Sequence, residues 1–248
     1  MKSVIILPDM HVPFHDRRVW RNVLRYIAGT GPHDEVVQLG DFLNLASISR
    51  HTKTNLRAIA ETTITEEYRI GNQVLDQLQE VIQPETKITI LEGNHDFWVE
   101  KYLDEHPQLV GTLEIEKGLR LKERGINWVR FWRDGAYHKI GKAVFVHGLH
   151  LNKHHSCSMA MAYGNNIFYG HTHDVQCHSL TRQGEHNTIV GQSLGCLCEY
   201  DQKYMQGKPT KWQQAFAHFF FNPNGTFQYY VIRVFNGKFI GPNGKEYR

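Results

Sequence analysis

Residues 4–11 read VIILPDMH and residues 35–41 read EVVQLGD, and these two stretches together decide the fold. Each is a short apolar run that ends in polar or charged residues, which is typical of a buried strand. Between them, Arg17 to Ala28 places its apolar side chains on one helical face, and Gly29 to Pro32 supplies helix breakers. The N-terminal part therefore predicts a β-α-β unit with parallel strands.

The same alternation continues before the chain turns to strands. A helical stretch is predicted from about Ala58 to Ile82, followed by a strand at Ile88 to Leu91 and by interrupted helices from Phe97 to Glu123. From Ile126 onward the pattern is dominated by strand-like runs, at Trp128 to Phe131, Ala143 to Val146, Ile167 to Tyr169, Thr188 to Val190, Ala215 to Phe221 and Phe227 to Phe235. We expect a single domain over residues 1–248, with helices outside two layers of sheet.

Composition excludes several classes of protein. The chain has 248 residues, of which 41% are hydrophobic and 21% charged, and these proportions exclude a disordered or fibrous protein. The longest apolar runs fall far short of the roughly 18 to 20 residues that cross a bilayer. The N-terminus has too short an apolar region for a secretory signal. We therefore expect a cytoplasmic protein with no membrane partner.

Histidine is unusually frequent, whereas cysteine is scarce. The sequence has 16 histidines and 4 cysteines, which directs attention to imidazole and carboxylate metal chemistry. The cysteines form no CxxC pair, so the spacing argues against a thiolate zinc site and favours reduced, partly buried thiols. They are Cys157, Cys177, Cys196 and Cys198.

Five short motifs lie at or just after the ends of predicted strands. They are Asp9-Met-His11, Gly40-Asp41, Gly93-Asn94-His95-Asp96, His147-Gly148 and Gly170-His171-Thr172-His173. In open α/β sheets, the loops at the carboxyl ends of the strands converge on one crevice. Asp9 and His11 lie two residues apart and project from the same side of an extended chain, and the same holds for His171 and His173. Each pair can therefore bind a metal ion together.

The motifs supply mixed nitrogen and oxygen donors, which suit first-row divalent ions. The candidate metal ligands are Asp9, His11, Asp41, Asn94, His147, His171 and His173. This set exceeds what one tetrahedral ion needs. Two ions roughly 3.5 to 4 Å apart, with Asp41 as a bridge, would use all of it, and such a pair clamps both the attacking and the leaving oxygen of an in-line phosphoryl displacement. The sequence therefore predicts hydrolysis of a phosphate ester.

The five motifs, in this order over residues 9–173, resemble those of the calcineurin-like metallophosphoesterase superfamily. The superfamily pattern is DxH, GD, GNH followed by an acid, a later HG, and GHxH. The resemblance implies a four-layer α/β/β/α sandwich of two mixed β-sheets flanked by helices. It also implies two divalent metal ions as cofactors, with Mn²⁺ favoured and Fe, Zn or Ni as alternatives.

Carried over by position, the resemblance also implies a role for each residue. It assigns Asp9, His11 and His173 to one ion, Asn94, His147 and His171 to the other, and Asp41 to both. A hydroxide bridging the ions would be the nucleophile, because the ions lower its pKa to roughly neutral. His95 is left to contact a phosphoryl oxygen, and either to protonate the leaving group or to stabilise charge in the transition state. His95 and Asp41 are thus the predicted catalytic residues, and Asp96 would orient His95 only if the loop folds back.

Departures from the pattern point to a branch of the superfamily. Serine/threonine phosphoprotein phosphatases resemble GDxVDRG and RGNHE, whereas this chain reads GDFLNL at residues 40–45 and EGNHD at residues 92–96. Both phosphate-clamping arginines are missing, which makes the chain more similar to phosphodiesterases and nucleases. The expected partner is therefore a phosphodiester such as a nucleotide, DNA or RNA. The alternatives are a phosphomonoesterase acting on a phosphoprotein or a small phosphate, and, more remotely, a non-catalytic scaffold.

Two further positions are candidate substrate contacts. Asn44 replaces the usual second acid of the GD motif, and His51 follows in a segment rich in small polar residues. A solvated surface loop is the alternative for His51. The cluster from Trp128 to Arg133 interleaves aromatic and basic residues, which is compatible with nucleic-acid contact and also with a sheet strand packed on a core.

Overall fold

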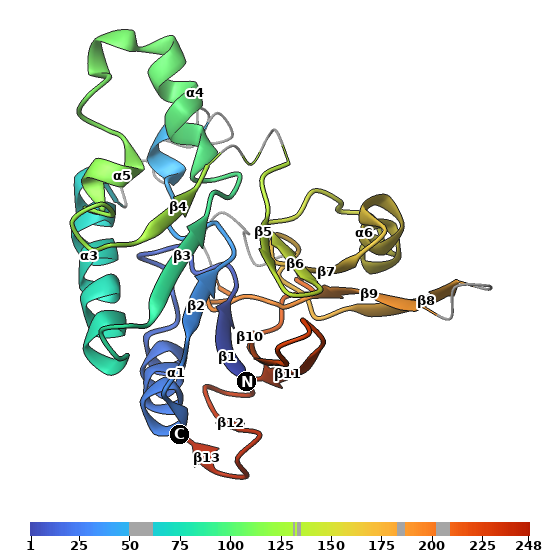
Figure 1. The fold of residues 1–248 in the computed structure, drawn as a ribbon. Helices are drawn as coiled ribbons and strands as arrows, with labels where there is room; N and C mark the ends of the chain where they lie inside the picture. The colour runs from blue at the N-terminus through green and yellow to red at the C-terminus, as the bar shows by residue number, and fades with distance from the viewer. Residues whose placement is uncertain (50–61, 131, 133–134, 183–186, 202–208) are drawn as a thin grey trace.

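A computed structural model describes residues 1–49, 62–130, 132, 135–182, 187–201 and 209–248 (Figure 1). Its larger sheet is mixed and has six strands. Their order across the sheet is β11 (Phe227–Arg233), β10 (Ala215–Phe221), β1 (Lys2–Leu7), β2 (Glu35–Gln38), β3 (Lys87–Leu91) and β4 (Asn127–Val129). Strands β1 to β4 run parallel, whereas β10 runs antiparallel to both β1 and β11. The parallel strands bring the first three motifs to one edge of this sheet.

The second sheet is also mixed and has five strands. Their order is β5 (His138–Ile140), β6 (Ala143–Val146), β7 (Asn166–Tyr169), β9 (Asn187–Ser193) and β8 (Cys177–Arg182). The central strands β6, β7 and β9 are parallel, and the edge strands β5 and β8 are antiparallel to their neighbours. A separate hairpin is formed by β12 (Phe239–Ile240) and β13 (Glu246–Tyr247).

Helices cover the outer face of each sheet. The described helices are α1 (Arg17–Thr30), α3 (Ile64–Val81), α4 (Phe97–Glu105), α5 (Ile115–Gly118) and α6 (His155–Tyr163), with 3-10 turns η1 (Ala46–Ile48) and η3 (Pro107–Leu109). Helices α1 and α3 lie on one side of the larger sheet, and α6 lies across the smaller one (Figure 1). No helix among the described residues is both long enough and apolar enough to cross a membrane.

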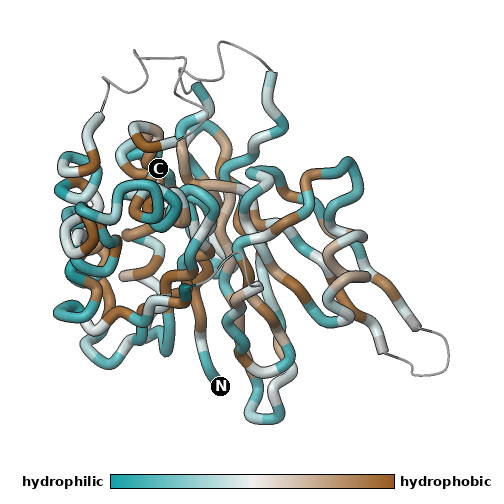
Figure 2. The backbone as a smooth tube through the Cα atoms, turned by 90° about the horizontal axis from the view of Figure 1, so that it is seen from above, coloured by the Kyte–Doolittle hydropathy of each residue, from teal (hydrophilic) through white to brown (hydrophobic). Residues whose placement is uncertain are grey.

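Three hydrophobic clusters pack between adjacent layers of helix and sheet. An aromatic core that includes Phe145, Phe168 and Phe219 fills the space between the two sheets. A larger cluster joins the outer face of the first sheet to α1 and α3, and a smaller one joins β6 and β7 to α6. The backbone tube in Figure 2 shows the brown, hydrophobic segments alternating with hydrophilic turns. The predicted order of helix, sheet, sheet and helix is therefore confirmed.

The starts of the two long helices follow from capping side chains. Asp16 accepts hydrogen bonds from the amides of Arg18 and Val19 at the start of α1. Thr63 accepts one from the amide of Glu66 at the start of α3, which is the Thr-x-x-Glu capping pattern. The predicted helix from about Ala58 begins at Ile64 in the described residues, and residues 50–61 lie outside them.

Helix α6 is absent from the sequence-based expectation, which has only strands after Ile126. Its sequence, HSCSMAMAY, has no charged face to mark a helical period. Its packing shows why it forms here. A Cβ atom on Gly191 of β9 would lie 2.1 Å from the carbonyl oxygen of Ser156, so the missing side chain lets the helix pack directly on the sheet. Tertiary packing rather than local pattern therefore specifies α6.

A buried polar network sits in the larger sheet, away from the motifs. The ring of His218 on β10 forms hydrogen bonds with the hydroxyls of Tyr26 (2.7 Å) and Ser3 (2.8 Å). The Ser3 hydroxyl in turn lies 2.9 Å from Nδ1 of His33. Burial, together with repulsion from His33, lowers the pKa of His218 to about 3.

This low pKa predicts a loss of stability in acid. The unfolded chain takes up a proton on His218 below about pH 6.5, the ordinary value, whereas the folded protein resists it down to about pH 3. His218 should therefore lower the free energy of unfolding by about 1.4 kcal/mol per pH unit as the pH falls through this window. Urea denaturation from pH 7 to pH 4 measures the slope, and His218→Asn should flatten it. An unchanged slope in the variant would exclude His218 as the cause.

Candidate metal centre

The five motifs converge at one edge of the two sheets. Asp9 follows β1, Asp41 follows β2 and Asn94 follows β3, all in the larger sheet. His147 comes directly after β6, and His171 follows β7, in the smaller sheet. Because all five strands end on the same side, side chains from distant parts of the sequence come within reach of one another.

The first cluster consists of Asp9, His11, Asp41 and His173. All four are buried, and their ligand atoms lie within 4.8 Å of one another. Nε2 of His11 is 3.0 Å from Nε2 of His173 and 3.6 Å from Oδ2 of Asp41. Nε2 of His173 is 3.4 Å from Oδ1 of Asp9. Two imidazole nitrogens and two carboxylates therefore face one small volume, an arrangement that suits a divalent first-row ion.

The second cluster consists of Asn94, His147 and His171, again with Asp41. Oδ1 of Asn94 is 2.9 Å from Nε2 of His147 and 2.8 Å from Nδ1 of His171. Nε2 of His147 is also 3.4 Å from Oδ1 of Asp41. Asp41 thus presents Oδ2 to the first cluster and Oδ1 to the second. The seven predicted ligands are brought together in the two groups that the resemblance implies, and their binding of ions stays a prediction.

Backbone hydrogen bonds tie the motif loops to one another. The amides of Met10 and His11 both donate to the carbonyl oxygen of Asp41. The amide of His95 donates to Oδ1 of Asp41 at 2.9 Å. The amide of His171 donates to the carboxylate of Asp9 at 2.9 to 3.0 Å. The loops that carry Asp9, Asp41, His95 and His171 therefore hold one another in position.

Four of the predicted ligands adopt left-handed backbone conformations. The φ angles are 49° at His11, 51° at Asp41, 66° at His171 and 58° at His173. Such conformations are uncommon outside glycine and cost on the order of 1–3 kcal/mol each, so they persist only where the surroundings enforce them. Strain concentrated on the ligands themselves is typical of a functional site.

Two glycines leave the space that the carboxylates need. A Cβ atom on Gly93 would lie 2.2 Å from the amide nitrogen and from Oδ1 of Asp41. A Cβ atom on Gly170 would lie 2.0 Å from Oδ2 of Asp9. Any side chain at either position would displace a ligand, so the absence of a side chain lets the backbone approach both carboxylates closely.

Burial and neighbouring charges shift the pKa values of the ligands in different directions. Burial opposes ionisation of Asp41, yet the positive charge of His147 lowers its pKa well below the ordinary value. Burial lowers the pKa of His11 well below its ordinary value, which keeps its ring neutral. Despite burial, the negative charge of Asp41 raises the pKa of His147 to about 9. An ion that binds there must displace this proton.

His95 stands beside the clusters in a fixed orientation. Its Nδ1 lies 2.7 Å from the carbonyl oxygen of Asn44, an acceptor, so the proton resides on Nδ1. The ring stacks on Trp98 with centroids 3.9 Å apart. Its Nε2 lies 4.0 Å from Oδ2 of Asp41. With the proton on Nδ1, Nε2 is the ring nitrogen on the side of Asp41 and carries the lone pair.

The remaining predicted residues have mixed outcomes. The carboxylate of Asp96 accepts hydrogen bonds from the amides of Gly93 (3.0 Å) and Leu43 (3.4 Å), so it braces two loops, whereas the carbonyl of Asn44 orients His95. The side chain of Asn44 is buried, and its role as a substrate contact stays a prediction. His51 lies outside the described residues.

Tryptophans flank the two clusters and form no part of the sequence motifs. The ring of Trp212 lies 4.3 Å from that of His173. The ring of Trp132 lies 6.2 Å from His147 and 6.3 Å from His171, and its Nε1 donates to the carbonyl oxygen of Gly148. Two sequence signals point to these tryptophans: Trp98 follows His95 by three residues, and Trp132 belongs to the aromatic and basic cluster from Trp128 to Arg133.

The described residues of the cluster from Trp128 to Arg133 differ in their surroundings, because Trp132 lies beside His147 and His171 whereas Trp128 and Arg130 do not. Trp128 lies on β4 and packs against the core between the larger sheet and its helices. The guanidinium of Arg130 pairs with Glu100 at 2.6 Å and with Glu116 at 3.5 Å. Both residues are therefore engaged within the protein, and Arg133 lies outside the described residues.

Comparisons with known proteins find two phage relatives and similar solved structures. No protein-family model matches the chain. Over 226 residues it is 25% identical to the Gene 54 protein of Mycobacterium phage L5 and to that of Mycobacterium phage D29, covering 87% of this chain and 88% of each relative. Among solved structures it is similar to Vps29 of Chaetomium thermophilum, with a TM-score of 0.47, 11% identity, and coverage of 95% of this chain and 93% of the other. For Vps29 complexed with the cyclic peptide RT-D3, the corresponding values are 0.44, 12%, 99% and 91%.

Proposed function

We propose that this protein is a dinuclear metal-dependent phosphoesterase that cleaves phosphodiesters in a nucleotide or a nucleic acid. The observation that carries the proposal is the position of Asp41, whose two carboxylate oxygens face two separate groups of nitrogen and oxygen donors. His95 stands beside the same carboxylate. Together with the ordered motifs, this arrangement supports membership of the metallophosphoesterase superfamily. A single domain over residues 1–248 remains part of the proposal.

The two donor groups fit divalent ions of the first row. Asp9, His11, Asp41 and His173 would hold one ion, and Asp41, Asn94, His147 and His171 the other. When bound, such ions lower the pKa of a bound water and neutralise charge on the transferred phosphoryl group. We favour Mn²⁺ for both positions, with Fe, Zn or Ni as alternatives.

The protein itself contributes positioning and proton control through His95. Burial lowers the pKa of His95 below its ordinary value, against the pull of Asp41, so Nε2 is unprotonated in the free protein. An anionic phosphate beside the ring would raise that pKa, because an opposite charge favours the protonated form. Binding of the substrate would thus favour protonation of His95 at Nε2. Nε2 would then donate this proton to the leaving oxygen.

The replacement of an arginine by a buried acid supports a phosphodiester substrate over a phosphomonoester. Glu92 comes directly before the third motif. It occupies the position that is an arginine in the phosphoprotein phosphatase pattern RGNHE. It is buried, and its carboxylate accepts a hydrogen bond from the amide of Trp132 at 2.8 Å. The arginine that would pair with the second negative charge of a phosphomonoester is therefore missing at this position, which supports a diester.

Hydrolysis of two reporter esters tests the proposal. Metal-stripped protein is reloaded with Mn²⁺ and assayed on bis-p-nitrophenyl phosphate and on p-nitrophenyl phosphate. Faster turnover of the diester, dependent on added metal, is expected. Turnover of the monoester alone would replace the diesterase by a phosphomonoesterase, and turnover of neither ester with two ions bound would contradict the enzymatic function.

His95→Ala should lower diester turnover by about 10²- to 10⁴-fold, the usual contribution of a positioned acid or base. Metal content should not change, because His95 belongs to neither group of ligands. Steady-state kinetics and elemental analysis measure the two quantities. His106→Ala, at the end of α4, is the matched control and should retain activity. Equal activity in His95→Ala and the wild type would remove His95 from the mechanism.

A further inference from the structure

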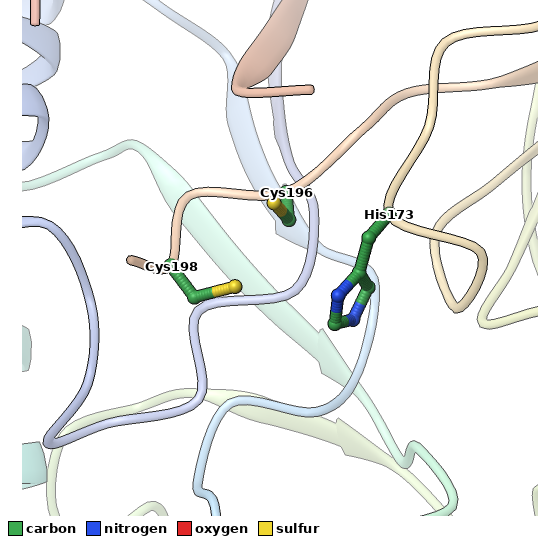
Figure 3. Close-up of side chains that lie close together, drawn as sticks. All are labelled: His173, Cys196 and Cys198. Carbon is green, nitrogen blue, oxygen red and sulfur yellow. The ribbon is translucent and has the colours of Figure 1, made fainter. Parts of the chain in front are cut away.

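A third cluster of possible metal ligands contains two cysteines and one histidine. It shares the histidine, His173, with the cluster of Asp9, His11 and Asp41. His173, Cys196 and Cys198 are buried, and their ligand atoms lie within 4.8 Å of one another. Both thiols are free. Figure 3 shows both sulfur atoms and a nitrogen-bearing edge of the His173 ring turned toward the same space. The CxxC criterion misses this cluster because the cysteines are spaced Cys-x-Cys and the histidine comes from the fifth motif.

His173 has one nitrogen to spare for this space. Its Nε2 faces His11 and Asp9 in the first metal cluster. Its Nδ1 is buried and has no hydrogen-bond partner within the protein, and the whole residue is only 6% exposed. A buried polar atom without a partner costs about 1–3 kcal/mol, so such an atom in a native structure calls for an explanation. A ligand in the space between Nδ1 and the two sulfurs would supply one.

The backbone holds both cysteines in place. The amide of Cys196 donates to the carbonyl oxygen of Gln213 at 3.1 Å, and the amide of Leu197 donates to that of Asp9 at 2.8 Å. The carbonyl oxygen of Leu197 accepts from the amide of Asp16 at 2.9 Å. The Leu197 side chain belongs to the core that the helices cover. The Cys-x-Cys segment is therefore anchored to the DxH motif on one side and to the segment before β10 on the other.

We propose that His173, Cys196 and Cys198 form a binding site for a thiophilic divalent ion of the Zn²⁺ type, distinct from the two clusters around Asp41. Two thiolates and one imidazole are a common zinc donor set, and they leave a fourth tetrahedral position for water or another ligand. With Zn–S bonds of about 2.3 Å, tetrahedral sulfurs stand roughly 3.8 Å apart. The two sulfur atoms already lie within 4.8 Å of each other, so only a small movement would bring them to this separation. Binding releases the two thiol protons.

Sharing His173 couples this site to the first cluster. A neutral imidazole has one nitrogen lone pair, so it can ligate through Nδ1 or through Nε2 but not through both. The two sites must therefore compete for His173 unless the ring loses its second proton and bridges the ions. The proposal does not depend on phosphoesterase activity, because a thiolate site can bind its ion in a protein that hydrolyses nothing.

Cobalt absorption tests the site without an activity assay. The full chain, reduced and stripped with a chelator, is titrated with Co²⁺, and thiolate-to-cobalt charge-transfer absorption reports sulfur ligation. The band should appear in the wild type, and added Zn²⁺ should bleach it. Cys196→Ser combined with Cys198→Ser should lose the band. The matched control combines Cys157→Ser with Cys177→Ser, which leaves Cys196 and Cys198 as the remaining thiols, and should keep it.

Each outcome decides for or against the site. Absence of the band in both the wild type and the Cys157/Cys177 control would overturn the proposal. So would a band that survives the Cys196/Cys198 substitutions. If the Cys196/Cys198 variant does not fold, as judged by circular dichroism, the control variant still decides, because a band there can come only from Cys196 and Cys198.

Discussion

Asp41→Asn is expected to lower diester turnover by at least about 10²-fold and to remove bound metal from both donor groups. The reason is that a neutral amide replaces the charge that both groups share, since each oxygen of Asp41 faces one of them. The same charge raises the pKa of His147 to about 9. Its removal should therefore also lower the pKa of His147, which NMR titration of the metal-free protein would detect. Metal content by elemental analysis and turnover of the diester reporter complete the test.

Asp104→Asn is the matched control for this substitution. Asp104 is an exposed residue on α4, so the same loss of one carboxylate should leave metal content and turnover unchanged. Wild-type metal content in Asp41→Asn would show that Asp41 does not join the two groups. The dinuclear interpretation would then fail even if some activity remained.

Gly93→Ala should have the second large effect, because the added methyl group overlaps Asp41. Its Cβ atom would lie 2.2 Å from both the amide nitrogen and Oδ1 of Asp41, and movement of Asp41 would break the hydrogen bond that Oδ1 accepts from the amide of His95. We expect loss of metal binding together with destabilisation of about 1–3 kcal/mol, the usual cost of overpacking. Thermal or urea denaturation and elemental analysis measure the two effects.

The position of the glycine, rather than the methyl group itself, should decide the outcome. Gly29 lies inside α1, where an added Cβ would meet the hydroxyl of Tyr247 at an ordinary 3.6 Å. Gly29→Ala should therefore keep full metal content and be neutral or stabilising by up to about 1 kcal/mol. A Gly93→Ala protein that binds metal as tightly as the wild type would contradict the crowding derived from the backbone.

Sequence reasoning was most successful where chemistry is encoded at strand ends. The runs before Asp9, Asp41 and Asn94 predict parallel strands, and parallel strands place their carboxyl ends together, so the proximity of these side chains follows from the pattern. The glycines beside them carry the same information, because only glycine tolerates the close approach seen at Gly93 and Gly170. The parallel part of the larger sheet and the proximity of its donors could thus be predicted from the pattern, whereas the division of the donors into two groups came from the family resemblance.

Features that depend on packing between distant segments could not be predicted in this way. Helix α6 has no hydrophobic stripe, and its position depends on Gly191 in a strand that follows it. The Cys196–Cys198 segment meets His173 because both adjoin the DxH loop, which no spacing rule records. The tryptophans around the clusters likewise reach them from separate elements.

The donors come from both sheets, and this origin has a mechanical consequence. Asp9, Asp41 and Asn94 extend from the larger sheet, and His147 and His171 extend from the smaller one. Ions held between them would link the two sheets, in addition to the aromatic core and the hydrogen bond from the amide of His171 to the carboxylate of Asp9. Slippage of one sheet past the other would then require breaking metal–ligand bonds, so the same ions that supply the chemistry would also set the rigidity of the sandwich.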